Sequence, residues 1–254
     1  MAIPENNSCN TYGLIGYPLG HSFSKGYFTR FFEEEQFNAE YKNFELPTID
    51  NLTQVLSEEK TLQGFNVTIP YKQQLIKFID EVDYAATAIG AVNVVKVTRQ
   101  DGRIYLKGYN TDVIGFANSI RPLLKPHHTH ALILGTGGAS KAVDYALRQM
   151  GLQTRFVSRT SSTDNLTYAE LTPEVLSHYT VIVNTTPLGM HPKIDECPPI
   201  DYTQLSERHL LFDAIYNPTK TKFLQFGEEA GATICNGMEM LIGQAKAAWS
   251  IWNE

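Results

Sequence analysis

Two polar clusters in the first half of this 254-residue chain place a lysine and a carboxylate where they could move a proton. One is GFNVTIPYK, residues 64–72, and the other is GYNTD, residues 108–112. Each follows an apolar run and precedes a helical pattern, so we expect Lys72 and Asp112 to face one cleft. A neighbouring carboxylate keeps a lysine charged and in place, and such a lysine can exchange a proton with a substrate oxygen. Taken singly, Lys72 would be a surface lysine and Asp112 a helix cap; the pairing favours the chemistry.

A third polar cluster, GYPLGHSFS at residues 16–24, follows the first apolar run. Ser22 and Ser24 are two residues apart and precede a helical pattern. Their hydroxyls, together with nearby backbone N–H groups, could hold a carboxylate. Helix capping is the alternative for Ser24, and the sequence leaves it open.

The second half contains a stretch typical of a dinucleotide site. An apolar run breaks into GTGGAS at residues 135–140, and a helical pattern follows. Glycines let the backbone approach a pyrophosphate, whose charge is favoured by the N–H groups and dipole of the helix start. The next apolar run ends at Ser158-Arg159-Thr160, where NAD sites usually place an acid, so a 2′-phosphate and NADP are favoured. The alternatives are a purely structural turn and, for Arg159, a solvated surface position.

Another polar segment, NTTPLGM at residues 184–190, ends a later apolar run. The hydroxyls of this segment could line the cofactor groove, although Pro187 and Gly189 suit any tight turn equally well. His127, His128 and His130 lie in a polar connector with no nearby cysteine or carboxylate, and we expect no metal site there.

The elements that must position these residues alternate along the chain between short apolar strands and helical patterns. This alternation predicts an α/β fold with a largely parallel sheet. Strands are expected at residues 12–16, 40–46, 64–68, 91–98, 103–109, 132–134, 180–184, 209–213 and 232–235. Helices are expected at residues 24–36, 70–79, 111–124 and 238–252, with one more that Asp50 would cap and one after the glycine loop. Asp101-Gly102 predicts a hairpin.

Two domains are expected from the length and from the polar connector at residues 125–130. Residues 1–112 would form an α/β substrate-binding and catalytic domain with a mainly parallel sheet. Residues 113–236 would form a Rossmann-type NADP-binding domain, and the amphipathic segment 237–254 would pack back onto the first domain.

Composition narrows the class of protein. A net charge of −6 argues against a general nucleic-acid surface, and no apolar run approaches the roughly 20 residues that span a bilayer. The start of the chain lacks the pattern of a signal peptide, and three widely spaced cysteines indicate neither a disulfide framework nor a metal pair. We therefore expect a cytoplasmic protein with a small-molecule substrate, either a monomer or a homodimer.

Taken in order, the polar clusters resemble the shikimate dehydrogenase family, which reduces 3-dehydroshikimate with NADPH. The matching blocks are GYPLGHSFS, FNVTIPYK, IGAVNVV, GYNTD, ILGTGGAS, VSRT, NTTPLGM, DAIYNP and NGMEMLIGQA. They run from residue 13 nearly to the C-terminus, and nine blocks in the family's order are hard to obtain by chance.

The resemblance implies a role for each matching residue. Lys72 would be the proton donor in reduction, oriented by Asp112. Ser22 and Ser24 would hold the substrate carboxylate. The remaining substrate contacts would be Thr68, Asn93, Asp112, Tyr216 and Gln244. The cofactor contacts would be Gly135, Gly137, Gly138, Ala139, Ser158, Arg159, Thr160, Thr186 and Gly237.

The chain departs from the family pattern at two places. Ser24 is followed by Lys-Gly-Tyr-Phe where the family usually has a proline and a His-Asn pair. Ser158 and Thr163 stand where the family commonly has asparagine and a second basic residue, so we expect weaker selectivity for NADP than is usual. Two other functions stay open: a quinate/shikimate enzyme using NAD or NADP, and a non-catalytic sensor of NADP(H). A sensor would not need Lys72, Asp112 and the two serines together.

Overall fold

The computed structural model describes residues 9–20 and 23–254, which fall into two compact units. The first unit runs to Asn110 and includes Ala248–Glu254, and the second is Thr111–Ala247. Within the described residues, every helix is too short or too polar to cross a membrane.

The first unit is built on a six-stranded mixed sheet with the order β2-β1-β3-β5-β6-β4. The strands are β1 (Asn10–Gly16), β2 (Ala39–Glu45), β3 (Leu62–Val67), β4 (Glu81–Val82), β5 (Val94–Gln100) and β6 (Arg103–Tyr109). β1 is parallel to β2 and β3, and β4 is parallel to β6, whereas β5 is antiparallel to both of its neighbours. The β5–β6 hairpin turns at Asp101 and Gly102, whose φ angles of 52° and 75° fit the predicted two-residue turn.

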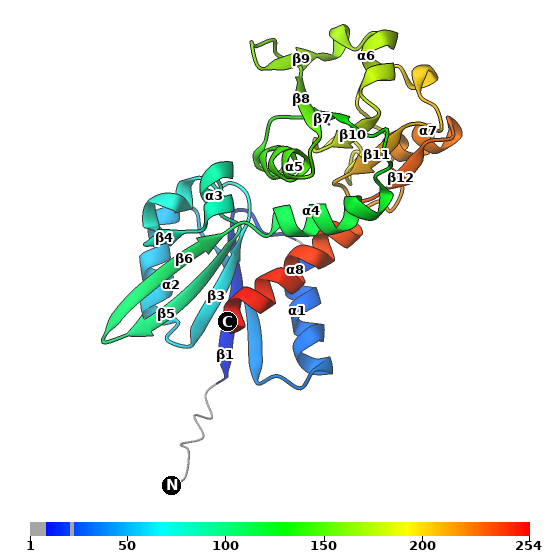
Figure 1. Cartoon of the computed structure of the whole chain (residues 1–254). Helices are drawn as coiled ribbons and strands as arrows, with labels where there is room; N and C mark the ends of the chain where they lie inside the picture. The colour runs from blue at the N-terminus through cyan, green and yellow to red at the C-terminus, as the bar shows by residue number, and fades with distance from the viewer. Residues whose placement is uncertain (1–8, 21–22) are drawn as a thin grey trace. The chain divides into compact units, whose positions relative to one another are not determined.

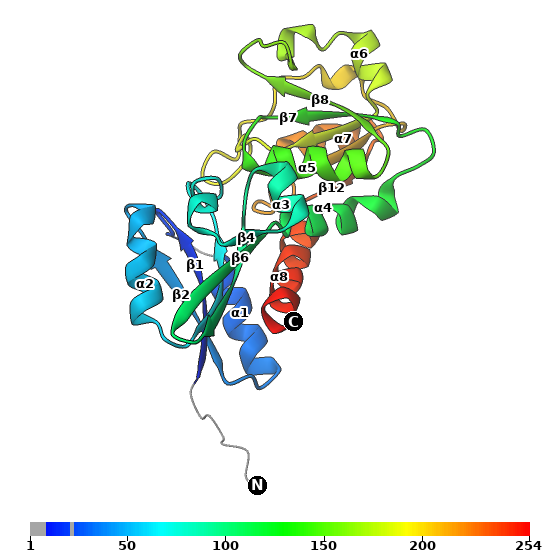
Figure 2. The ribbon, with the colours of Figure 1, turned by 60° about the vertical axis from the view of Figure 1, so that its left-hand side comes forward.

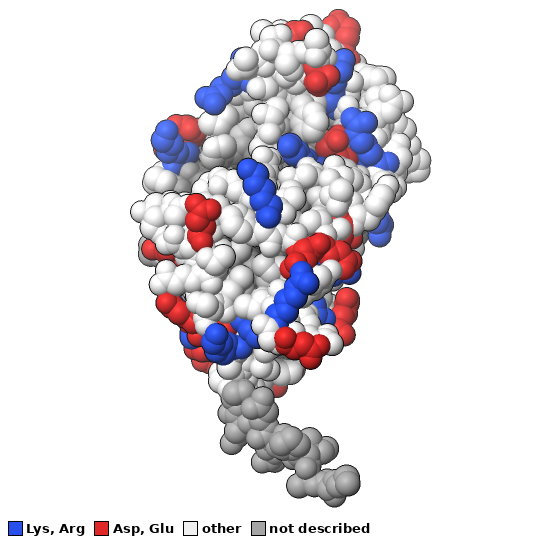
Figure 3. Space-filling view, turned by 90° about the vertical axis from the view of Figure 1, so that its left-hand side faces the viewer, with Lys and Arg blue, Asp and Glu red and all other residues white. Residues whose placement is uncertain are grey.

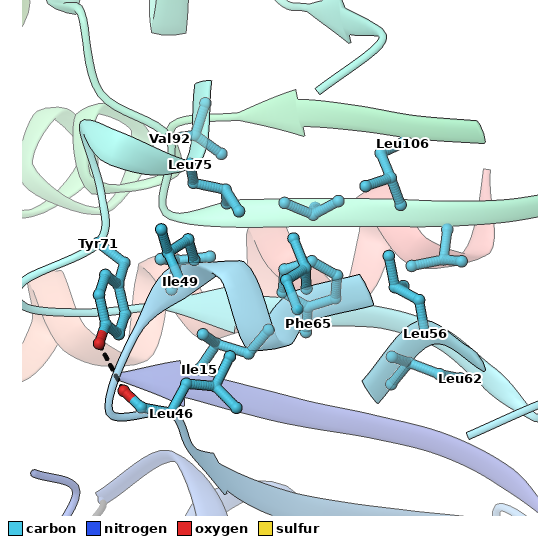
Figure 4. Close-up of a cluster of buried hydrophobic side chains, with 14 of the residues drawn as sticks. Ile15, Leu46, Ile49, Leu56, Leu62, Phe65, Tyr71, Leu75, Val92 and Leu106 are labelled. Carbon is cyan, nitrogen blue, oxygen red and sulfur yellow. Dashed lines mark hydrogen bonds between the residues drawn. The ribbon is translucent and has the colours of Figure 1, made fainter. Parts of the chain in front are cut away.

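Helices cover both faces of this sheet. They are α1 (Phe23–Glu34), α2 (Leu52–Glu58) and α3 (Tyr84–Ile89), with 3₁₀ turns at Ile49–Asn51 and Gln74–Phe78. α1 packs beside β1 and β2 (Figure 1). On the other face, Leu52 and Leu56 of α2 belong to a buried cluster that includes Phe65 of β3. Figure 4 labels Leu56 and Phe65.

Two local expectations are wrong here. Pro70 does not begin a helix, because residues 70–73 form turns and only the short 3₁₀ segment Gln74–Phe78 follows. Asp50 is not the cap before α2; the Thr48 hydroxyl accepts from the Asp50 N–H instead, and Asp50 lies inside the 3₁₀ turn. At Asp50 the competing contact is local, because Thr48 caps the 3₁₀ turn two residues earlier. At residues 70–73 the contact is tertiary, because the Lys72 carbonyl accepts the Val92 N–H.

The last residues of the chain complete the first unit. Trp252 is 5% exposed, stacks on Tyr12 with ring centroids 4.9 Å apart, and donates through Nε1 to the Val95 carbonyl at 3.0 Å. The ring occupies the space above Gly64, where a Cβ would lie 2.2 Å from Trp252 Cδ1. The missing side chain in β3 therefore makes room for the C-terminal tryptophan.

The second unit is built on a parallel six-stranded sheet with the order β12-β11-β10-β7-β8-β9. The strands are β7 (His130–Leu134), β8 (Gln153–Ser158), β9 (Asn165–Thr167), β10 (Val181–Asn184), β11 (Leu210–Asp213) and β12 (Thr233–Cys235). Counted from β7, this is the 3-2-1-4-5-6 order of the dinucleotide-binding fold. The Rossmann-type expectation is confirmed.

Helices cover both faces of the second sheet as well (Figure 2). They are α4 (Asp112–Ile120), α5 (Gly138–Gln149), α6 (Pro173–His178), α7 (Lys222–Glu229) and the part of α8 (Met238–Asn253) that ends at Ala247, with 3₁₀ turns at Arg121–Leu123, Tyr168–Glu170 and Tyr202–Gln204. α4 and α5 share one buried cluster with β7, β10 and β11, and α6 and α7 share another. In parallel sheets of this order, ligands bind beyond the carboxyl ends of the strands, near the point where the strand order reverses.

Candidate functional site

The backbone of Lys72 is held from two sides in the first unit. Its carbonyl accepts the Val92 N–H at 2.7 Å. The preceding residue, Tyr71, is 4% exposed, and its hydroxyl donates to the Leu46 carbonyl at 2.5 Å (Figure 4). Lys72 itself is only partly buried. The buried Tyr71 and the bond to Val92 therefore fix the backbone position of Lys72, from which its side chain extends.

Two further predicted substrate residues lie at the same edge of the first sheet as Lys72. Thr68 directly follows β3, and its N–H donates to the Ile15 carbonyl at the end of β1 at 2.9 Å. Asn93 directly precedes β5, is 2% exposed, and accepts the Val67 N–H through its backbone carbonyl at 2.8 Å. Because β3 and β5 are antiparallel, the end of one strand lies next to the start of the other. The fold thus brings Lys72 and Thr68 of the FNVTIPYK block to the same sheet edge as Asn93 of the IGAVNVV block.

Ser24 belongs to a buried polar chain that the sequence did not suggest. It lies in the first turn of α1 and hydrogen-bonds to Tyr41. The Tyr41 hydroxyl donates to Asn66 Oδ1 at 2.7 Å. Burial raises the pKa of the Tyr41 phenol well above its ordinary value, and the hydrogen bond with Ser24 opposes part of that rise. Ser22 lies outside the described residues.

Asn66 and Tyr41 were not among the predicted site residues. Asn66 belongs to the FNVTIPYK block, and its place in that block is the feature of the sequence that could have pointed to a role in the site. Tyr41 lies in β2, where a buried tyrosine is most simply read as core. Its proximity to Ser24 depends on pairing β2 beside β1, which the local sequence does not encode.

Asp112, Tyr216 and Gln244 belong to the second unit. Asp112 is 4% exposed and is the first residue of α4, where a carboxylate also benefits from the positive end of the helix dipole. Tyr216 follows β11 by three residues and is partly buried, and Gln244 lies in α8. Each of these three residues interacts with at least one other group of the protein.

The glycine loop joins β7 to α5 at the carboxyl edge of the second sheet. Gly135 has a φ of +104°, a conformation that favours glycine, and a Cβ there would lie 3.0 Å from Thr185 Oγ1. Gly137 is the N-cap of α5 and provides no side-chain cap. A Cβ on Gly137 or Gly138 would find no atom within 4 Å, and Ala139 is partly exposed. The N–H groups of the helix start are therefore open to a phosphate, as a pyrophosphate cradle requires.

Ser158, Arg159 and Thr160 follow the same edge at the end of β8. Ser158 is partly buried, its hydroxyl accepts the Thr160 N–H at 3.3 Å, and Arg159 and Thr160 are exposed. The Thr160 carbonyl accepts from Asn165 Nδ2 at 2.9 Å, which ties the turn to β9. An exposed guanidinium and an exposed hydroxyl thus adjoin the partly buried hydroxyl of Ser158, a donor set suited to a phosphate monoester.

Thr186 and Gly237 lie on loops that follow β10 and β12. The Thr186 hydroxyl and N–H both donate to Asn184 Oδ1, at 2.7 and 3.0 Å. Gly237 donates its N–H to the Ile215 carbonyl at 3.0 Å, and a Cβ on it would lie 2.2 Å from the Ala214 carbonyl oxygen. Only glycine allows these two backbones to approach so closely.

Charge and metal ligands complete the description. On the face shown in Figure 3, basic and acidic side chains are interspersed. His127 and His128 both contact the Arg208 carbonyl, at 3.1 and 3.0 Å. No cluster of three or more possible metal ligands occurs among residues 9–20 and 23–254.

Comparison with known proteins shows the family of the chain. The family profile described as "Shikimate dehydrogenase substrate binding domain" matches residues 14–95. A protein named shikimate dehydrogenase (NADP(+)) from Clostridium beijerinckii is 36% identical, over 96% of this chain and 92% of its own length. The chain belongs to the shikimate dehydrogenase family.

The chain also resembles solved structures over nearly its whole length. The crystal structure of shikimate dehydrogenase from Aquifex aeolicus has a TM-score of 0.83 and 34% identity, covering 96% of this chain and 92% of its own. Quinate dehydrogenase from Corynebacterium glutamicum in complex with NAD also has a TM-score of 0.83, with 25% identity, covering 96% of this chain and 93% of its own.

Proposed function

We propose that the chain is a shikimate dehydrogenase, an NADP-dependent oxidoreductase that interconverts 3-dehydroshikimate and shikimate. One observation carries the proposal: the chain contains both halves of the reaction's machinery, an uncapped glycine-rich start of α5 and a lysine with a fixed backbone at a polar sheet edge. A non-catalytic sensor of NADP(H) would need only the glycine-rich start of α5. Bound NADPH would supply the hydride that reduces the substrate carbonyl.

In this proposal Lys72 performs the proton step. During reduction its ammonium donates a proton to the carbonyl oxygen that becomes the hydroxyl of shikimate, and during oxidation the neutral amine takes that proton back. By the same family match, Asp112 is proposed as the residue that orients the lysine side chain. The fixed backbone of Lys72, between Tyr71 and the Val92 contact, limits the conformations from which the proton can be delivered.

We assign the substrate and cofactor contacts to the residues of this chain that match the motifs of the family. The hydroxyls of Ser22 and Ser24 would donate to the substrate carboxylate, and the hydrogen bonds through Tyr41 to Asn66 would hold Ser24 in place. The other proposed substrate contacts are Thr68, Asn93, Asp112, Tyr216 and Gln244. The proposed cofactor contacts are Gly135, Gly137, Gly138, Ala139, Ser158, Arg159, Thr160, Thr186 and Gly237.

An assay of the purified protein with shikimate or quinate, each with NADP⁺ or NAD⁺, tests the function. We expect nicotinamide reduction to be fastest with shikimate and NADP⁺. Lys72→Ala should lower kcat by about 10²–10⁴-fold without weakening NADP⁺ binding. Lys77→Ala, at an exposed lysine in the next 3₁₀ turn, is the matched control and should leave kcat unchanged. Absence of reduction with all four pairs would exclude an enzyme of this class, and near-normal turnover by Lys72→Ala would remove Lys72 from the mechanism.

Gly137→Ala tests the cofactor cradle independently of catalysis. Its Cβ meets no protein atom within 4 Å and its φ of −79° suits alanine, so the fold should tolerate the change. The same Cβ would enter the space assigned to the pyrophosphate, and we expect the Kd for NADP⁺ to rise by at least about tenfold. An unchanged Kd would mean that the pyrophosphate lies elsewhere.

A second candidate is a quinate/shikimate enzyme that accepts NAD. It is favoured by the single arginine at the 2′-phosphate position, with Thr163 in place of a second basic residue, and by the similarity to a quinate dehydrogenase. Arg159→Ala should raise the KM for NADP⁺ and leave the KM for NAD⁺ unchanged. Arg148→Ala, about 15 Å along α5 from its start, is the control. Equal KM values for the two cofactors in the unaltered protein would favour this second candidate.

The domain roles and the cellular setting are also proposals. Residues 1–112 with 237–254 would bind substrate, and residues 113–236 would bind NADP. Cys9, Cys197 and Cys235 are all unpaired, which suits a reducing, cytoplasmic setting. The choice between a monomer and a homodimer needs a measurement of mass in solution.

A further inference from the structure

The second unit buries a carboxylate for which the proposed chemistry has no use. Asp213, the last residue of β11, is 0% exposed. Three groups donate to it: Asn184 Nδ2 at 3.1 Å and the Ile215 N–H at 3.0 Å to Oδ1, and the Thr221 hydroxyl at 2.5 Å to Oδ2. A buried charge is costly unless its partners compensate it, so its retention at this edge calls for a reason.

One set of these bonds leads to the loop after β10. Asn184, also 0% exposed, uses its amide nitrogen on Asp213 and its oxygen on the N–H and hydroxyl of Thr186. The bond to Asp213 thereby fixes which way the Asn184 amide faces, because a carboxylate accepts only from the nitrogen. With the amide reversed, Thr186 would lose its acceptor.

The other set leads to the loop after β11 and to Gly237. The Ile215 N–H donates to Asp213, and the Ile215 carbonyl accepts the Gly237 N–H at 3.0 Å. Thr221, the N-cap of α7, holds the second carboxylate oxygen and so prevents the carboxylate from rotating. Asp213 thus joins the Thr186 loop and the Gly237 loop through one intervening residue each.

We propose that Asp213 is a positioning residue that sets the two loops of the NADP groove, at Thr186 and at Gly237, to one spacing. This inference rests on the proposed function, because it takes both loops as cofactor contacts. Asp213 need not touch the cofactor; its effect would pass through Asn184 and Ile215.

The test measures NADP⁺ binding by titration calorimetry and steady-state KM values on the full chain. Asp213→Ala and Asn184→Ala should each raise the Kd and KM for NADP⁺ by about tenfold and leave the KM for shikimate unchanged. Asp213→Asn keeps an oxygen for both N–H donors, and its amide can donate to the Thr221 hydroxyl. It should restore the Kd to within about threefold of the unaltered protein.

The matched control is His209→Ala, which breaks buried hydrogen bonds at the opposite end of the same strand. His209 is 3% exposed and contacts the Leu176 carbonyl at 3.0 Å. It should lower the melting temperature without changing either KM, because a loss of folded protein lowers the apparent kcat alone. Circular dichroism identifies variants that fail to fold.

The outcomes distinguish a failure of the positioning role of Asp213 from a failure of the proposed function. Unaltered NADP⁺ binding in Asp213→Ala, or in Asn184→Ala where Asp213→Ala does not fold, overturns the positioning role. Equal rises in the KM for NADP⁺ and for shikimate also overturn it, since they indicate a general disturbance. If the unaltered protein itself binds no NADP⁺, the proposed function fails rather than this inference.

Discussion

The burial of Asp213 should also make the stability of the protein depend on pH. Burial raises the pKa of its carboxyl from 3.8 to about 6, against the opposing hydrogen bonds from Thr221, Ile215 and Asn184. Between these two pH values the folded chain holds a proton that the unfolded chain has released. The contribution of Asp213 to the free energy of unfolding therefore falls as the pH rises through this window.

The size of the effect follows from the width of the window. A difference of about two pH units corresponds to about 3 kcal/mol. Asp213→Asn removes the titration and keeps the shape of the side chain. The free energy of unfolding of the unaltered protein minus that of the variant should therefore decrease by up to about 3 kcal/mol between pH 4 and pH 7.

Urea unfolding followed by circular dichroism at several pH values measures this difference. Tryptophan fluorescence is unsuitable, because Trp249 and Trp252 both belong to the first unit. Asp201→Asn is a control of opposite sign: hydrogen bonds from Thr203 lower the pKa of the Asp201 carboxyl, so its stabilising contribution is lost as the pH falls. A difference for Asp213→Asn that is flat or increases with pH would refute the reasoning.

The remaining predictions concern packing and the two proposed sites. Gly237→Ala should raise the KM for NADP⁺ at least about tenfold, because its Cβ would lie 2.2 Å from a backbone oxygen that has little room to move; an unchanged KM would separate this loop from the cofactor. Trp252→Ala should lower the free energy of unfolding by about 3–5 kcal/mol in urea titrations. Combining it with Gly64→Ala should cost less than the two separate losses, since the added Cβ fills space that the ring has left; additive losses would contradict that contact. Tyr41→Phe keeps the ring stacked on Phe28 and removes only the hydroxyl, so the KM for shikimate should rise a few-fold with kcat little changed; a selective loss of kcat would contradict a binding role.

Local pattern predicted most of the secondary structure. Four strands of the second unit, β7, β10, β11 and β12, were expected within a residue or two of their observed bounds, because buried parallel strands read as short apolar runs between turn residues. The hairpin at Asp101 and Gly102 followed from the dipeptide alone. The short strands β4 and β9 were missed, because two or three residues show no period and exist only through pairing with a neighbour.

The same distinction applies to the candidate site. The glycine loop, Arg159 and Lys72 could be selected from residue type and order, since their chemistry depends on short sequence blocks. The polar chain from Ser24 through Tyr41 to Asn66 could not, because its members come from α1, β2 and β3 and meet only when those elements pack. Asp213 belongs to the matching block DAIYNP, but nothing in the sequence indicated that its carboxyl is buried.

By itself, the sequence determined the fold class and the family, and it predicted which groups would do the chemistry. These depend on residue type, on period and on spacing within short segments. Only the tertiary structure decided which polar groups are buried together, which backbones approach so closely that glycine is required, and which carboxyl has its pKa raised by burial. Those properties arise from strand order and the exclusion of water, and neither exists until distant segments have packed.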